Sequence, residues 1–193
     1  MGEGDPARMA RALLSEAELP NEPAIGVVQR LLRAIGYDFR GAANSLRAND
    51  SLIRARSAGM LADAARGLAA LSAKFREEFI PPATREQPFP PAEIMKALQG
   101  LDALRRRVGE ASSAMLTQQT PGSDSVWARL RSERALLERL LTADIELVSA
   151  AHVVCGAVER LSLAEVRQRH LAAVEAPLAA VDAALKSRGV LLD

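Results

Sequence analysis

The fold is decided by residues 125–160, which read SVWARLRSERALLERLLTADIELVSAAHVVCGAVER. This stretch contains no proline, and its apolar residues recur at alternating spacings of four and three. That heptad pattern is typical of a helix that buries one face against other helices, as in a coiled coil. We therefore expect one continuous helix about 54 Å long. Its seam consists of Val126, Leu130, Glu133, Leu137, Leu140, Asp144, Leu147, Ala151, Val154, Val158 and Leu161.

Two acidic residues, Glu133 and Asp144, interrupt this apolar seam. Polar seam residues can set the register and the oligomeric state of packed helices. Alternatively, the helix is rotated so that both carboxylates face solvent, and we favour this exposed position.

Three further long helices are expected at residues 42–79, 91–119 and 162–188, each with apolar residues at helical spacing. Ser162 and Glu165 match a capping box at the start of the last one, in which Pro177 should cause a kink or a split. Four long helices joined mostly by short turns predict an all-α protein, a long antiparallel bundle forming one domain over residues 1–193. A solenoid is the alternative, but the segments differ too much in length to favour it.

Two short helices are expected before the bundle, at residues 5–19 and 23–35. Their apolar residues need cover, because an isolated helix of this length is marginal in water. They either dock on the bundle or meet another chain, and we favour an interface. These residues are Met9, Leu13, Leu14, Val27, Val28, Leu31, Leu32 and Ile35.

A proline-rich connector separates the first two long helices, at residues 81–91. It holds five prolines in eleven residues, which no helix can continue through. We expect an extended segment that is attached to the bundle mainly by Phe89.

The composition supports helix and argues against several classes of function. The chain has 37 Ala and 27 Leu but only 3% aromatic residues, which favours helices over sheets. Its 25 basic residues are balanced by 24 acidic ones, whereas a dedicated nucleic-acid binder usually has a basic excess.

The single cysteine suits a reducing cytoplasm, and the acidic N-terminus does not resemble a secretory signal. The longest nearly apolar run, residues 147–158, is too short to cross a membrane. We expect a soluble, cytoplasmic protein.

Residues for catalysis or metal binding are scarce. The residues three positions before His152 and His170 are Ser149 and Arg167, so the Glu-x-x-His motif of di-metal bundles is absent. His152 and Cys155 share a helix face, but core packing explains them better than a nucleophilic pair. No glycine-rich phosphate loop occurs. We therefore expect no catalytic residue, no cofactor, no metal ligand and no enzyme activity.

One local excess of positive charge occurs at residues 40–56, which hold Arg40, Arg47, Arg54 and Arg56 against Asp50 alone. A continuous helix would align the first three on one face, where they could contact an anion or an acidic partner. A solvated helix face is the more ordinary explanation.

These observations favour a non-catalytic helical bundle that binds a protein partner or associates with itself. The alternative is nucleic-acid or anionic-ligand binding through Arg40, Arg47, Arg54 and Arg56, and the third hypothesis is an enzyme of an unfamiliar helical type. Whichever applies, we expect the core of residues 125–160 to face the helices at 91–119 and 162–188 through Leu137, Leu140, Leu147, Val154 and Val158.

Overall fold

The computed structural model describes residues 43–82, 85, 89–118 and 124–192. Of these described residues, 89% are helical and none is in a strand, so the all-α prediction is confirmed for this part of the chain. The two short helices expected at residues 5–19 and 23–35 lie outside the described residues. The helices are α3 (Ala43–Phe79), α4 (Ala92–Thr117), α5 (Asp124–Ser132), α6 (Arg134–Arg160), α7 (Leu163–Arg167) and α8 (Ala172–Leu192).

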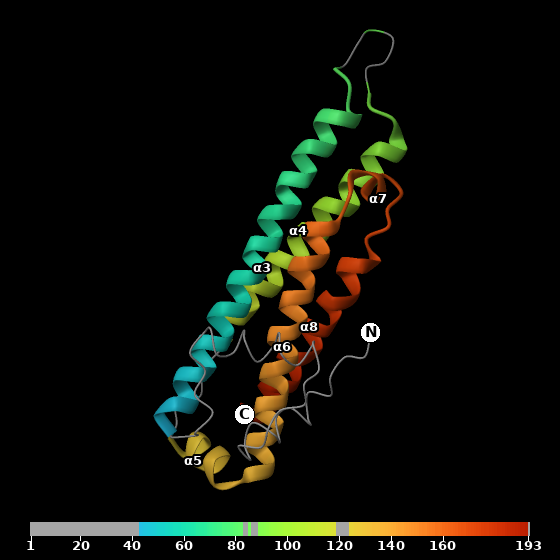
Figure 1. Cartoon of the computed structure of the whole chain (residues 1–193). Helices are drawn as coiled ribbons and strands as arrows, with labels where there is room; N and C mark the ends of the chain where they lie inside the picture. Colours follow the sequence, from blue (N-terminus) through green and yellow to red (C-terminus); the bar gives the residue numbers. More distant parts are fainter. Residues whose placement is uncertain (1–42, 83–84, 86–88, 119–123, 193) are drawn as a thin grey trace.

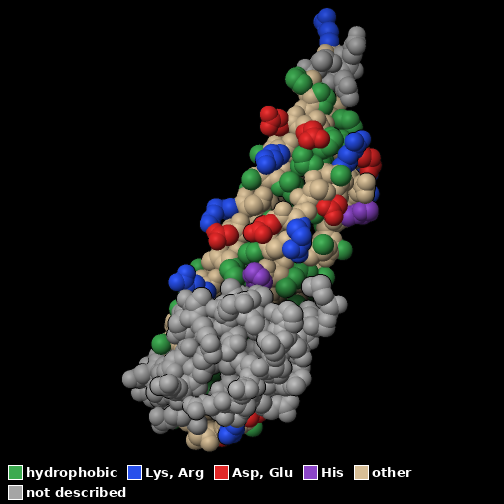
Figure 2. Space-filling model, viewed as in Figure 1, with side chains coloured by type: hydrophobic (Ala, Val, Ile, Leu, Met, Phe, Trp, Pro, Cys, Tyr) green, Lys and Arg blue, Asp and Glu red, His purple; other side chains and the backbone are tan. Residues whose placement is uncertain are grey.

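The described part of the chain is elongated, with α3, α4, α6 and α8 running along its length (Figure 1). Acidic and basic side chains are interspersed over the described part of the face that Figure 2 shows. Helix α3 packs extensively against both α4 and α6, and α6 packs extensively against α8. Helix α4 meets α7 and α8 over shorter stretches. The main apolar core lies between these helices, and its fully buried side chains include Leu61, Leu68, Leu101, Val108, Leu147 and Val174.

The connector after α3 is placed as the prolines predict, but its attachment differs. Helix α3 ends at Phe79, before Pro81, and Pro91 occupies the N-cap of α4. Phe89 is 80% exposed, so the prediction that it anchors the connector is wrong. Phe79 and Ile80 pack against the core instead.

Residues 125–160 do not form one helix, because the chain turns at Glu133. Glu133 has φ −104° and ψ 94°, an extended conformation that ends α5 and precedes α6. The turn brings Trp127 and Leu130 of α5 back against Leu140. They form a second, smaller apolar cluster together with Leu191 and Leu192 at the end of α8. The predicted single helix is therefore wrong, and the turn builds this separate cluster.

The last predicted helix also divides, although not at its proline. The capping box is confirmed, since the Ser162 hydroxyl accepts from the Glu165 backbone and the Glu165 carboxylate accepts from the Ser162 N–H at 2.8 Å. Helix α7 then ends, and Arg169 adopts a left-handed conformation with φ 60°. Pro177 lies inside α8, which continues through it. Only the first turn of α8 precedes Pro177, so the proline deprives little more than one carbonyl of its helical donor.

Helix α6 buries the face that its heptad pattern predicts. Leu140, Leu147, Val154 and Val158 are buried and Leu137 is half-buried. Its main neighbours are α3 and α8, so the predicted packing on residues 91–119 is wrong.

Among the described helices, α6 alone is long and apolar enough to cross a membrane. However, 61% of its apolar window is buried inside the protein. The core helix of a bundle has the same property, so this is weak evidence for a membrane span.

Candidate functional site

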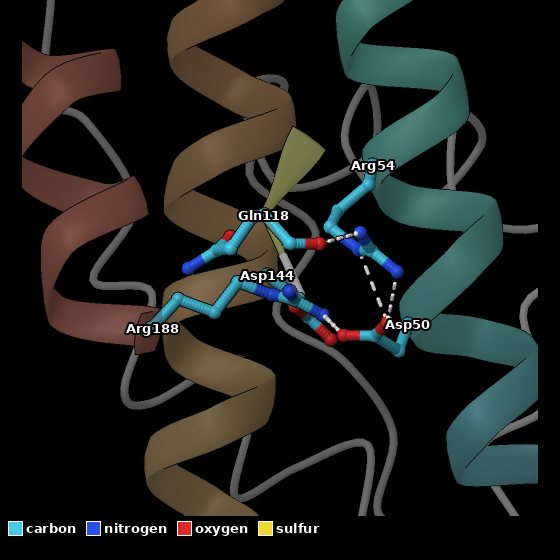
Figure 3. A network of polar contacts seen from close by, with 5 residues as sticks. All are labelled: Asp50, Arg54, Gln118, Asp144 and Arg188. Atoms are coloured by element: carbon cyan, nitrogen blue, oxygen red, sulfur yellow. Dashed lines mark hydrogen bonds and ion pairs between the residues drawn. The ribbon is translucent and has the colours of Figure 1, made fainter. Parts of the chain in front are cut away.

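A layer of buried charged side chains crosses the interior near the beginning of α3 (Figure 3). Asp50 and Arg54 come from α3, Asp144 from α6 and Arg188 from α8. Arg54 is 8% exposed and the other three are at most 1% exposed. We call these four residues the ionic layer.

Arg188 is the centre of the ionic layer. Its Nε donates to Asp144 Oδ1 at 2.6 Å, and one terminal nitrogen, Nη2, donates to Asp50 Oδ1 at 2.7 Å. A single side chain from α8 therefore bridges α6 and α3. The other terminal nitrogen, Nη1, is buried and has no hydrogen-bond partner among the described residues.

The second arginine extends the layer to α4. Arg54 donates from Nε and Nη2 to Asp50 Oδ2, at 3.1 and 2.7 Å. Its Nη1 donates to the backbone oxygen of Gln118, the C-cap residue of α4, at 2.6 Å. Charged donors satisfy helix-end carbonyls well. The layer thus connects α3, α4, α6 and α8.

The two arginines and the two aspartates balance in charge. Burial alone would lower the pKa of Arg188, but Asp144 and Asp50 outweigh that effect and raise it above its ordinary value. Arg188 therefore stays charged at any ordinary pH. Buried charges that must meet their partners can fix the register of packed helices, so we take the ionic layer to select how these helices align.

The structure separates the two acidic seam residues. Glu133 is exposed at the turn before α6, as predicted, but Asp144 is buried, so its predicted exposure is wrong. The partner that keeps Asp144 in the interior lies 44 residues further along the chain. Arg188 carried one signal in the sequence, because it continues the buried stripe of Val174, Leu178 and Val181.

The four arginines of residues 40–56 are not brought together as one exposed surface. Arg54 faces the interior and Arg56 is exposed. Arg40 lies outside the described residues, and although Arg47 is in α3, its side chain is not described. Anion contact by Arg40, Arg47 and Arg56 stays a prediction, while Arg54 already binds Asp50.

His152 and Cys155 do not form a nucleophilic pair. His152 is exposed, so the predicted core position is wrong for it. Cys155 is half-buried, and its thiol donates to the carbonyl oxygen of Met60 at 3.1 Å. Burial raises the pKa of this thiol, with smaller contributions from Asp63 and Glu159. A protonated, hydrogen-bonded thiol is a poor nucleophile.

Another feature is the outward side of α8, which carries almost no charge. Its charged residues, Glu175, Asp182 and Lys186, follow the helical repeat along one edge. Every residue of the neighbouring strip is exposed, and Val190 is 67% accessible. We call this strip the α8 outer face, and it consists of Ala172, Ala176, Ala179, Ala180, Ala183, Ser187 and Val190.

No group of three or more potential metal ligands occurs among the described residues. No protein-family model matches the chain, and comparisons with curated proteins and with solved structures found no match either. The ionic layer and the α8 outer face are therefore the features of the described residues that bear most on function.

Proposed function

We propose that the protein is a non-catalytic helical interaction module, built as a long antiparallel bundle of α3, α4, α6 and α8, which binds another helix along the α8 outer face. That helix belongs to a second copy of the chain or to a protein partner. The observation that carries the proposal is an exposed face without charge along the whole of α8.

The shape and chemistry of this face suit a helix. Helix α8 has 21 residues, so the face is about 31 Å long. Alanine and serine side chains allow two helix backbones to approach closely, and ridges of such residues fit into the grooves of a partner helix. A contiguous apolar surface of this kind is typical of interaction sites.

The ionic layer supports the proposal by holding α8 in place. Arg188 fixes the last turns of α8 to α3 and α6 through Asp50 and Asp144. A rigid helix loses little conformational freedom when it binds, so less of the binding energy is spent on ordering it.

A charge placed in the middle of the face tests the proposal. We expect Ala179→Arg to abolish self-association of the full chain in sedimentation equilibrium, or to abolish recovery of a partner in a pull-down analysed by mass spectrometry. Ala69→Arg is the matched control, because Ala69 is an exposed alanine within α3.

The control should associate as the unmodified chain does. The proposal fails if the unmodified chain is monomeric up to about 100 μM and recovers no protein that Ala179→Arg loses. It also fails if the two variants behave alike.

The same experiment separates the alternative of anion binding. Binding through Arg40, Arg47 and Arg56 would weaken steeply as salt is raised, because phosphate contacts release counterions. Association through an uncharged face should change little with salt, and Arg56→Ala should leave it unaltered.

A further inference from the structure

The described part of the chain consists of two helical hairpins. Helices α3 and α4 pack extensively against each other and form the first half, and α6 and α8 do the same in the second half. Helix α5 follows the first half, and the chain then enters α6 at Glu133. Between Asp124 and Arg160, Glu133 is the only residue outside a helix. One bent residue therefore separates α5 from the second half.

The bend at Glu133 has little local support. It contains no proline or glycine, and the Glu133 side chain makes no capping hydrogen bond with α6. Helical bonding continues up to this residue and resumes from it, because the Glu133 N–H donates to Arg129 at 3.0 Å and its carbonyl accepts from Leu137 at 3.1 Å. The bend is held instead by contacts between distant residues, in which Trp127 meets Leu140.

The sequence is suited to a straight helix through this bend. A helical Glu133 would join α5 and α6 and would supply acceptors to N–H groups at the start of α6, which a helix beginning at Arg134 lacks. Apolar residues keep their heptad spacing on both sides of Glu133. These residues are Val126, Leu130, Leu137 and Leu140.

Straightening the bend carries the first half away from the second. A straight helix places Asp124 about 30 Å from Asp144 along its axis. Gln118, at the end of α4, lies in the ionic layer beside Asp144 (Figure 3), and residues 118–124 span at most about 21 Å when extended. Helix α4 therefore leaves its place, and α3, which packs against α4, moves with it.

We propose that two copies of the chain exchange their halves by straightening this bend. The first half of one copy packs on the second half of the other, and a helix of residues 124–160, about 55 Å long, joins the two bundles. The contacts between halves form again between chains. In the ionic layer, Arg188 of one copy binds Asp50 of the other.

The contacts within one chain identify the second copy as the partner. The first half presents an apolar face of α3 that fits α6, and it presents Asp50 at 2.7 Å from Arg188 of the second half. Only another copy of this chain offers both matching surfaces in the same register. Exchange of identical elements is a low-cost route to a dimer, because it alters the hinge and keeps the other contacts. The halves must separate first, so the dimer forms on refolding rather than on mixing folded chains.

A disulfide between the halves distinguishes exchange from association of closed chains. The Sγ of Cys155 in α6 lies 3.1 Å from the carbonyl oxygen of Met60 in α3, so Met60→Cys should pair with it. The full chain is refolded from urea under reducing conditions at about 100 μM, monomer and dimer are separated by size exclusion, and each is oxidised. In non-reducing electrophoresis, we expect the monomer to close its disulfide within one chain and the dimer to be covalently linked.

A disulfide within the first half is the matched control. Ser72 Oγ and Asp102 Oδ1 are 3.0 Å apart, so Ser72→Cys with Asp102→Cys, in a Cys155→Ser background, should give single chains in both fractions. The proposal is overturned if refolding yields no dimer. It is also overturned if the Met60→Cys dimer carries its disulfide within each chain, which is the result for closed copies joined through the α8 outer face.

A proline at the start of α6 gives an independent answer, even if the cysteines do not pair. Proline is well tolerated at the first position of a helix, and the extended conformation of Glu133 is the one that a residue before proline prefers. In the straight helix the same proline would lie in the interior, where it removes a hydrogen bond and clashes with the preceding turn. We therefore expect Arg134→Pro to keep the folded monomer and to lower the dimerisation constant on refolding at least about 100-fold.

Arg134→Ala is the control, because both variants lose the exposed ion pair with Glu138 and only the proline opposes the straight helix. It should dimerise as the unmodified chain does, and equal dimerisation of the two variants would overturn the proposal. This inference does not depend on the α8 outer face. Ala179→Arg should leave exchange intact and Arg134→Pro should leave association through that face intact, so the two failures can be distinguished.

Discussion

Replacement of Arg188 by methionine should destabilise the protein more than any single surface change. Arg188 is completely buried and bridges Asp144 and Asp50 at 2.6 and 2.7 Å. Arg188→Met keeps most of the side-chain volume but leaves both carboxylates without this cation. Asp50 still binds Arg54, whereas Asp144 loses the hydrogen bond from Arg188 Nε. Removal of one partner from a buried ion pair costs about 3–5 kcal/mol.

That cost is measurable by urea denaturation followed by circular dichroism at pH 7. In a chain of this size it corresponds to a fall in melting temperature of about 6–20 °C. Arg106→Met is the control, because Arg106 is exposed and should change stability by no more than about 0.5 kcal/mol.

A double variant distinguishes loss of charge pairing from loss of packing. In Arg188→Met with Asp144→Leu, the carboxylate that Arg188 binds is removed as well, so much of the lost stability should return. Two results would contradict this role of Arg188. One is a free energy of unfolding of Arg188→Met within about 1 kcal/mol of the unmodified protein. The other is a double variant that loses more stability than the two single changes lose together.

Three further predictions concern other parts of the structure. Leu147→Ala should lower the free energy of unfolding by about 2–5 kcal/mol, because Leu147 is fully buried. Val153→Ala, at a site 45% exposed, should lower it far less. Equal losses of stability in urea melts would contradict the placement of Leu147 in the core. Cys155 should react with a disulfide reagent at pH 8 more slowly than free cysteine, because burial raises its pKa and the thiol binds Met60, and it should reach the free rate in urea. Hydrogen bonds from the side chain and backbone of Ser162 lower the pKa of Glu165, so the capping box should stabilise α7 above about pH 4.3 and lose this effect as the pH falls through the lowered pKa. Amide chemical shifts of α7 would follow that loss, and Glu165→Gln should make them independent of pH in this range.

The sequence was sufficient where local signals decide the structure. The prolines at 81 and 91 bound α3 and α4, and the Ser162–Glu165 capping box marks the start of α7. The same holds for the buried face of α6, whose leucines and valines follow a helical repeat.

Contacts between distant residues could not be predicted in this way. The turn at Glu133 has no proline or glycine, and we ascribe it to the burial of Trp127 against Leu140 and Leu191. The position of Asp144 depends on Arg188 in another helix. Pro177 does not split α8, because it lies so near the start of the helix that only the turn before it is affected.

The long sequence separation within the ionic layer has a consequence for the order of folding. Asp50 and Arg188 are 138 residues apart, so their ion pair closes a very long loop. The α3–α4 hairpin closes a far shorter loop and can form early. Arg188 can bind its two aspartates only after α8 has packed against α3 and α6. Interactions that form after the rate-limiting step slow unfolding without accelerating folding. The ionic layer should therefore contribute mainly to kinetic stability: it lowers the rate of unfolding more than it raises the rate of folding.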